Sequence, residues 1–277
     1  MSTGQRAGGA RRGWTIALLS WIAIAAVGPW LAPISFRAQD RAAALAPPGV
    51  VRTGGVGHHW LGTDEFGRDE WSRLLVANGL STLLGVAMAA PALLLAAGVG
   101  LASALSPGAA EAGRIGGEIG RSLPWIFVLV AVRAALPLDA GLGAIALALV
   151  VLFAVAAWPV AAWAIYGAAR DLVQRDFVRA AEGLGATRWY ILRRHLWPNL
   201  RGLLATYFAL LVAAAIGAEV SLEMVGLGLP QPWPTWGNLL EPLRNFTLAT
   251  DCWWLYTPLI AVVAVLLGLT LAADYSG

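Results

Sequence analysis

Three charged residues lie inside apolar stretches of this chain, where an ionised side chain is costly to place. Glu219 and Glu223 are one helical turn apart, and Arg133 lies in an earlier apolar stretch. Ionised groups in a membrane interior cost about 2.5–3.5 kcal/mol on insertion scales, so they are normally paired or face a cavity. The two glutamates could meet a cationic amino group or a metal ion on a transport pathway. They could also pair with Arg133, near the outer end of the third stretch, and hold helices together, which is the interpretation that we favour.

The familiar catalytic and cofactor patterns are missing from the sequence. His58 and His59 are adjacent, so they cannot form the H-E-x-x-H zinc motif, whose two histidines lie one helical turn apart. The chain has no G-x-x-x-x-G-K-[ST] phosphate loop, and no nucleophile with a nearby base stands out. The single cysteine, Cys252, excludes a disulfide within the chain and any site with several cysteine ligands. We therefore expect a chain that is not an enzyme, holds no cofactor and takes its energy from another subunit.

The composition is that of a membrane protein. Hydrophobic residues make up 58% of the chain and charged residues 13%, against roughly 25% charged in a soluble domain. Several apolar stretches have about 20 residues, the length that crosses a hydrocarbon core as a helix. Six can be marked: Trp14–Ala32, Leu80–Leu105, Leu123–Leu136, Gly141–Gly167, Gly202–Ala218 and Cys252–Ala272. The sequence predicts an all-α, polytopic bundle of about six transmembrane helices, with a segment of residues 1–13 followed by one membrane domain of residues 14–277.

The distribution of arginine predicts the orientation of this bundle. Arginines are concentrated between the fourth and fifth stretches, where seven occur (Arg170, Arg175, Arg179, Arg188, Arg193, Arg194 and Arg201), whereas only Arg244 lies between the fifth and sixth. Because cytoplasmic loops keep an excess of basic residues, we expect residues 169–199 and both termini to be cytoplasmic, and loops 34–78 and 226–251 to be external. A signal peptide could also follow the first arginines, but the apolar run is longer than its usual 7–15 residues and no cleavage site follows.

The arginine-rich segment predicts two short helices joined at a glycine. From Asp171 to Leu184, apolar residues recur at helical spacing on one side, with charged residues opposite. Gly185 can adopt the left-handed conformation that ends a helix, and Thr187 can cap the next one. Pro198 marks the junction with the following span. A soluble partner could grip such a hairpin, or the hairpin could lie on the membrane with its arginines facing anionic lipid.

The residues of this segment resemble the loop signature of bacterial ABC importer permeases. The run Asp176–Thr187, with the RHLWPN sequence after it, carries alanine, glycine and proline at the spacing of that family. The resemblance implies a coupling helix that docks in a groove of an ATPase subunit. The positions that it assigns to this contact are Arg179, Ala180, Ala181, Glu182, Gly185, Ala186 and Pro198. Arg179 stands where the family usually has glutamate, so the polar contact at that position differs here.

The resemblance extends over most of the chain. The run His59–Leu74, with its WLGTDEFGRD sequence, is similar to a signature of the second permease of oligopeptide, dipeptide and nickel importers. Glu118, six residues before Pro124, also fits the acidic residue and proline of the family's third span, as do the GLG sequence from Gly226 and the PTWGN sequence that ends at Asn238. Without the resemblance, the residues of the first run, His59–Leu74, are equally compatible with a salt-bridged loop at the outer interface and with a substrate contact.

The resemblance implies a permease subunit in the bacterial inner membrane that forms half of a translocation pathway. Its expected partners are membrane lipid, a second homologous permease, two ABC ATPase subunits and an external solute-binding protein, and no nucleic acid. The implied substrate is a dipeptide or oligopeptide, with nickel or another small solute as the alternative. A hypothesis from another class, a self-powered secondary transporter or channel that uses Glu219 and Glu223 as ion sites, is also compatible with the residues.

Overall fold

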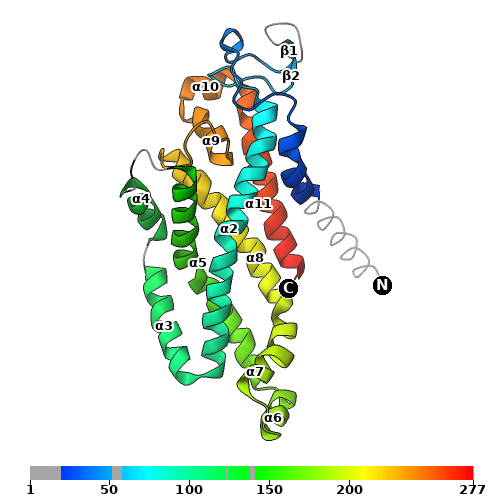
Figure 1. The fold of residues 1–277 in the computed structure, drawn as a ribbon, viewed down its shortest axis with the longest axis vertical. Coiled ribbons are helices and arrows are strands. Elements are labelled where there is room, and N and C mark those ends of the chain that lie inside the picture. The colour runs from blue at the N-terminus through cyan, green and yellow to red at the C-terminus, as the bar shows by residue number, and fades with distance from the viewer. Residues whose placement is uncertain (1–19, 52–57, 123, 136, 138–140, 277) are drawn as a thin grey trace.

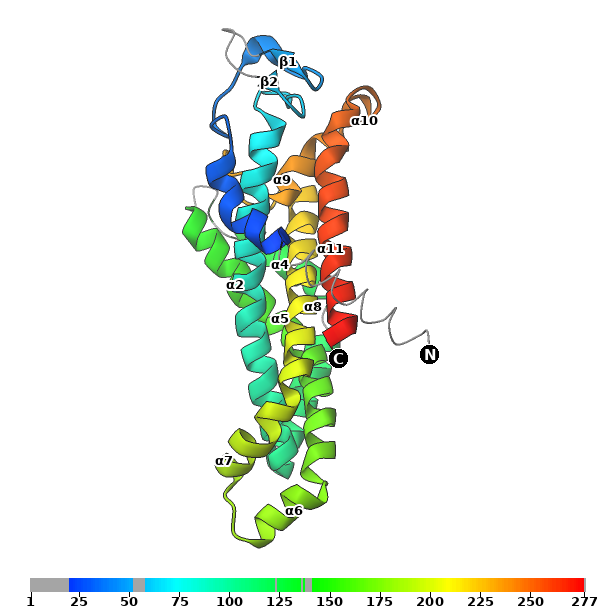
Figure 2. The same ribbon diagram turned by 90° about the vertical axis from the view of Figure 1, so that its right-hand side faces the viewer.

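The computed structural model shows a long bundle of helices with irregular segments at one end and a helical hairpin at the other (Figures 1 and 2). It describes residues 20–51, 58–122, 124–135, 137 and 141–276. Within these ranges, the side chains of residues 121, 125, 126, 129, 132, 133 and 274–276 lie outside the description. Apart from one pair of two-residue strands, the elements of the described part are helical, as predicted.

Four long helices form the body of the bundle. They are α2 (Glu70–Leu105), α5 (Leu142–Val173), α8 (Trp197–Met224) and α11 (Thr257–Ser276). Each, with its flanking helical turns, is long and apolar enough to cross a membrane. Each coincides with one of the predicted apolar stretches, because a run of about 20 apolar residues in lipid satisfies its backbone only as a helix or in a closed barrel.

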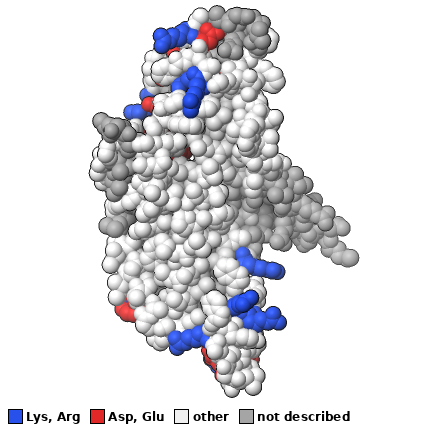
Figure 3. All heavy atoms as spheres, viewed as in Figure 1, with Lys and Arg blue, Asp and Glu red and all other residues white. Residues whose placement is uncertain are grey.

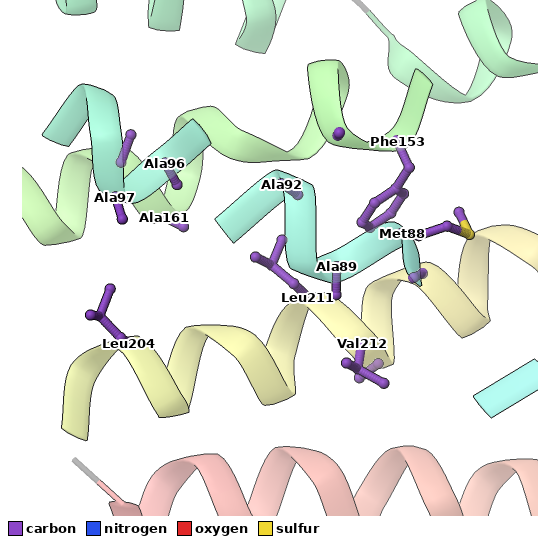
Figure 4. Packing of buried hydrophobic residues seen from close by; sticks show 14 of the residues in the cluster. Met88, Ala89, Ala92, Ala96, Ala97, Phe153, Ala161, Leu204, Leu211 and Val212 are labelled. Atoms are coloured by element: carbon purple, nitrogen blue, oxygen red, sulfur yellow. The ribbon is translucent and has the colours of Figure 1, made fainter. Parts of the chain in front are cut away.

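Helix α2 lies between α5 and α8, and small side chains let the three backbones come close. Ala89, Ala92 and Ala96 of α2 are fully buried, and Figure 4 shows Ala89 and Ala92 near Phe153 of α5 and Leu211 of α8, and Ala96 near Ala161 of α5. Small residues at helix interfaces allow this close van der Waals packing inside a membrane, where lipid tails offer no hydrophobic gain. The alanine-rich sequence of α2 therefore makes it the central helix of the bundle.

The third predicted stretch, Leu123–Leu136, differs from the expectation. It contributes only α4 (Trp125–Ala135), whose 11 residues reach about 16 Å, roughly half of a hydrocarbon core. A second helix, α3 (Pro107–Ser122), precedes it, and the two lie end to end along α5 in Figure 1. Pro124 lies between them and cannot continue a helix from α3. The apolar stretch alone was too short to predict α3, which carries charges.

The described part of the first predicted stretch is a short apolar helix, Ser20–Leu31, and its first residues, 14–19, lie outside the described residues, as does the segment of residues 1–13. By length and composition, the described residues thus contain four full spans, and the count of six stays a prediction.

The irregular end of the molecule is built from the two predicted external loops. Strands β1 (Val50–Val51) and β2 (His58–His59) pair antiparallel, so that Val50 lies opposite His59. The short helices of this end are η1 (Arg41–Ala43), α9 (Trp236–Leu240), η3 (Glu241–Arg244), α10 (Phe246–Asp251) and η4 (Trp253–Tyr256). The first loop is shorter than the predicted 34–78, because Asp69 caps α2 by accepting a hydrogen bond from the Ser72 N–H.

The opposite end is a hairpin of α6 (Asp176–Gly183), α7 (Arg188–Ile191) and the π-helical turn η2 (Leu192–Leu196). Helix α5 runs on to Val173, so the first residues of the predicted segment 169–199 belong to the membrane helix. The last residues of that segment, from Trp197, begin α8.

Candidate functional site

The first candidate region is the hairpin of residues 176–196, whose turn is built around a glycine. Gly185 has φ +84°, and the Ala186 N–H donates to the Ala181 carbonyl at 3.0 Å. This is the left-handed helix ending that glycine favours, because other residues meet a steric penalty there. A Cβ added at Gly185 would touch nothing within 4 Å, so a side chain would have room there. Glycine is required because of the positive φ angle of the backbone.

The second arm of the hairpin is continuous with a membrane helix. The Thr187 hydroxyl caps α7 by accepting from the Tyr190 N–H at 3.3 Å. From Arg188 the helical backbone passes through α7 and η2 into α8 and ends at Met224. Pro198 sits in the first turn of α8, where its missing N–H is tolerated. The second arm of the hairpin and α8 therefore form one rod of 37 residues, roughly 56 Å long.

The two arms of the hairpin are packed against each other and onto the bundle. Val178 of α6 and Ile191 of α7 are buried. The His195 ring lies 5.6 Å from the ring of Phe177 in α6 and 5.8 Å from that of Tyr190 in α7, measured between centroids. These contacts tie α6 to the rod, so a displacement of the hairpin tip must be passed on to α8.

The tip of the hairpin exposes large apolar side chains. Leu184 is 90% exposed and Trp189 68%, and beside them lies a hollow of about 420 Å³. Its lining residues are Ala181, Leu184, Gly185, Ala186, Thr187 and Tyr190. Exposed apolar patches rimmed by polar residues mark surfaces that bind another protein. Figure 3 shows arginine side chains gathered around this end of the molecule, and on the face drawn there the middle of the bundle is almost without charge.

The second candidate region is a buried polar cluster at the opposite end of the rod. Glu219 and Glu223 are only 2% and 6% exposed. The Ser81 hydroxyl of α2 donates to Glu219 Oε2 at 3.3 Å and accepts from the Trp236 N–H of α9 at 2.9 Å. An added Cβ on Gly237 would lie 2.6 Å from Cβ of Glu223. The glutamates thus lie directly beneath α9 and join it to α2 and α8.

Above this cluster, Arg68 of the first predicted external loop and Arg73 in the first turn of α2 reach across to the second predicted external loop. Arg68 donates from Nε to Asp64 Oδ2 at 2.6 Å and from Nη1 to Gln231 Oε1 at 2.7 Å. Arg73 donates from Nη2 to Asn238 Oδ1 at 2.8 Å, while its Nε lies 3.7 Å from Asp64 Oδ2. Buried charges need partners of this kind. The geometry therefore favours the salt-bridged interpretation of the WLGTDEFGRD run.

Comparison with known proteins now identifies the family. Residues 75–276 match the family described as binding-protein-dependent transport system inner membrane component. The chain belongs to this family. It is 31% identical over 247 residues to the "Probable D,D-dipeptide transport system permease protein DdpC" of Escherichia coli K12, a match that covers 89% of this chain and 78% of the relative. It is 28% identical over 247 residues to the "Dipeptide transport system permease protein DppC" of Bacillus subtilis, which covers 87% and 72%.

A solved structure of the MetNI methionine ABC transporter, in inward-facing conformations, is 21% identical and covers 74% of this chain and 90% of the solved one, with a TM-score of 0.47. The family match itself confirms the prediction from sequence that the chain is a multi-pass permease subunit of an ABC importer.

In the permease, the predicted ATPase-contact residues lie on the hairpin, except Pro198, which lies in the first turn of α8. Arg179, Ala180, Glu182, Gly185 and Pro198 are exposed, and Ala181 and Ala186 are half-buried. The apolar side of α6 points outward at Phe177, which is 46% exposed. Val178, which the pattern did not single out, is the buried residue of α6. The role of these residues as an ATPase contact stays a prediction.

The predicted pair of the glutamates with Arg133 stays a prediction as well, because the Arg133 side chain lies outside the described residues. Ser81 and α9, which the sequence analysis did not connect with Glu219, are partners that the structure adds. No signal in a single sequence pairs residues 138 positions apart when one of them is an ordinary serine in an apolar run.

We expect glutamine at position 219 of the permease to keep assembly and most of the uptake. A glutamine side chain has nearly the same shape and still accepts the Ser81 hydrogen bond, whereas Glu219→Leu removes the acceptor and should cost about 1–3 kcal/mol of stability. Uptake and subunit assembly are measured side by side in both variants and in Glu223→Gln. Loss of uptake in either glutamine variant with assembly intact would instead place the negative charge on the substrate pathway.

Proposed function

We propose that this permease is one of two membrane subunits of an ATP-driven peptide importer in the bacterial inner membrane. Its partners are a second homologous permease, two ABC ATPases and an external solute-binding protein. The substrate class, a dipeptide or oligopeptide, is taken from the names of the relatives, and nickel or another small solute is the alternative. The observation that carries the proposal is the exposed apolar tip of the hairpin at the arginine-rich end of a rod that runs through the bundle.

The hairpin is the part that receives force from the ATPase. Leu184 and the hollow beside it offer an apolar contact to a groove on the motor protein, and exposed arginines surround this contact. When ATP draws two motor subunits together, the hairpins of the two permeases move with them. Because α6 is packed onto the rod through His195, the motion is passed to α8 and not absorbed in the loop.

The outer end of the same rod controls access from outside. Glu219 and Glu223 lie on α8 beneath α9, and Ser81 links this point to α2. A shift of α8 along or around its axis therefore has to displace α9 and the external loops bound to it. In this way a cytoplasmic event opens or closes the outer side of the pathway, and the central cavity changes from inward-facing to outward-facing.

The arrangement in the membrane follows from the same proposal. The hairpin and both termini are cytoplasmic, and the loops that carry β1, β2, α9 and α10 are external. The helix Ser20–Leu31 contributes the first of six crossings, and α3 with α4 contributes the third. This arrangement puts the arginine-rich hairpin inside, as expected when basic residues accumulate on the cytoplasmic side.

Cross-linking tests the proposal directly. We expect Leu184→Cys, treated with a maleimide–succinimide cross-linker, to be joined to a lysine of the co-expressed ATPase, because the side chain is 90% exposed at the tip. Phe246→Cys, 81% exposed at the opposite end, is the matched control and should react only with an impermeant thiol reagent added outside. The native Cys252 is buried and does not compete. No ATPase adduct from position 184, or labelling of that position from outside intact cells, would refute the proposal.

A further inference from the structure

A second hollow lies on the hairpin side of the bundle, away from the regions described above. It has a volume of about 470 Å³ and is formed where the last turns of α2 and α5 meet the first turns of α3. The side chains that matter for its chemistry are Glu111, Arg114, Trp158, Trp163, Tyr166 and Arg170. We call it the inner pocket. It combines aromatic walls with two guanidinium groups, a combination that suits an anion attached to an apolar body.

The two arginines of the inner pocket differ in what they already bind. Arg114 is held by two carboxylates: its Nη2 lies 2.6 Å from Glu111 Oε1 and its Nη1 2.7 Å from Glu118 Oε1. Arg170, in contrast, donates from Nη1 to the Tyr166 hydroxyl at 3.0 Å, and it forms no ion pair with any carboxylate in the part of the chain that the structure describes. Its charge is therefore available to an anion in the pocket.

The surroundings of Arg170 are those of a membrane interface. The Tyr166 and Trp163 rings meet edge to face with centroids 5.7 Å apart, and the guanidinium carbon of Arg170 lies 5.9 Å from the Tyr166 centroid. Tryptophan and tyrosine are enriched at the level of lipid headgroups, and an arginine beyond them reaches the phosphates. Arg170 follows Tyr166 by one helical turn, toward the hairpin end of α5.

An apolar track leads from the lipid-facing surface of the bundle into the pocket. Leu95 of α2 is 44% exposed, and Val99, one turn further along the same face of α2, lines the pocket. Ala162 and Gly100 continue this wall. A free anion has no use for such a track, whereas an acyl chain would cover it. The track therefore favours a lipid over a small soluble ion.

We propose that the inner pocket binds one phospholipid of the leaflet on the hairpin side. Its phosphate accepts hydrogen bonds from Arg170, its glycerol backbone lies against Trp163 and Tyr166, and one acyl chain follows Leu95 and Val99. The site rests on the proposed membrane arrangement, but not on the ATPase contact. A lipid here would wedge α3 against α2 and α5 and so hold the end of the bundle that carries the hairpin.

Native mass spectrometry of the full-length permease in mild detergent tests this proposal. We expect the wild type to retain one added phosphatidylglycerol molecule and not diacylglycerol, which has the same chains without phosphate. Arg170→Gln should weaken retention by about tenfold or more, because it removes a charge-assisted hydrogen bond to the phosphate. Tyr166→Phe should weaken it less. Arg201→Gln is the matched control, since Arg201 is exposed at the same end of the bundle but does not line the pocket.

Four results would overturn the proposal. Equal loss in Arg170→Gln and Arg201→Gln would mean that lipid binds by general surface charge, and equal retention of diacylglycerol would mean that the phosphate is not recognised. Displacement of the lipid by millimolar inorganic phosphate would identify a free-anion site. Expulsion of the lipid when the second permease binds would identify a subunit contact. If Arg170→Gln fails to fold, the diacylglycerol and phosphate experiments on the wild type still decide the outcome.

The lipid-retention assay contains no ATPase, so its result does not depend on that of the hairpin cross-link. Either experiment can fail while the other succeeds.

Discussion

A permease that carries Leu184→Asp should reach the membrane at wild-type levels but lose at least nine-tenths of its uptake. Leu184 is 90% exposed, so its replacement removes no packing from the permease itself. In the proposed complex the side chain enters an apolar groove, where a buried unpaired carboxylate costs on the order of 2–4 kcal/mol or more. That cost lowers the affinity for the ATPase by roughly 30-fold to 1,000-fold. Uptake of a labelled peptide by the complete transporter and co-purification of the ATPase are the two measurements.

Leu184→Met is the matched control, because it keeps an apolar side chain of similar volume and should leave both measurements nearly unchanged. Arg179→Glu adds a second check, since it installs the residue that the family usually carries and should not weaken ATPase retention. If Leu184→Asp transports normally, or loses uptake while ATPase retention is unchanged, the tip is not the docking surface.

The membrane helices were predictable from sequence because lipid leaves the chain few choices. A stretch such as Gly202–Ala218 has to be helical, and α8 contains all of it. The ends of the helices were harder to predict, because they depend on single capping groups. Asp69 starts α2 nine residues before the boundary of the predicted loop, and α3 was missed because its sequence is charged and not apolar.

The turn of the hairpin was also predictable, because one residue type accounts for it. A glycine between two amphipathic runs predicts a left-handed helix ending, and Gly185 has that conformation. The inward face of α6 was not predictable in the same way. Helix α6 has only 8 residues and carries apolar side chains on more than one side. Its sequence pattern therefore does not tell which side packs against the rest of the chain and which side is left for a partner. Here the more apolar face is the outward one, which is itself a reason to expect a partner.

The outer polar network lay beyond sequence reasoning because its members are distant in the chain. The charges of the WLGTDEFGRD run were recognised, but their neutral partners Gln231 and Asn238 were not. Arg68 and Gln231 are separated by 163 positions, and Arg73 and Asn238 by 165. Amides give no signal of their own in a loop. Only the folded chain brings them to the arginines, so an interaction between the two external loops could not be inferred from either loop alone.

This network leads to the second large expected effect: Arg73→Ala should be the most destabilising single substitution at the outer end. Arg73 is 1% exposed, lies 3.7 Å from Asp64 and donates to Asn238 at 2.8 Å. Arg73→Ala leaves the buried Asp64 with Arg68 as its cationic partner and removes the charged hydrogen bond to Asn238, so we expect a cost near the lower end of the about 3–5 kcal/mol that breaking a buried ion pair costs. Asn238→Ala removes the acceptor of the Arg73 hydrogen bond and of a second one from Gln231 Nε2 at 3.1 Å, but no charge, and should cost roughly 1.5–3 kcal/mol. Thermal unfolding of the purified permease and its yield in membranes measure both effects.

A variant that combines Arg73→Ala with Asn238→Ala tests whether the two residues stabilise the protein through one shared interaction or through independent contacts. If Arg73 and Asn238 act through their shared hydrogen bond, the cost of changing both should fall short of the sum of the single costs by about 0.5–3 kcal/mol. Arg37→Ala is the matched control: Arg37 is exposed and stacks on Trp233 at 5.0 Å, a surface contact worth about 0.5–1 kcal/mol. Equal costs for Arg73→Ala and Arg37→Ala, or strict additivity in the double variant, would show that the two external loops are not joined by this pair. In that case a shift of α8 could open α9 without disturbing the WLGTDEFGRD loop.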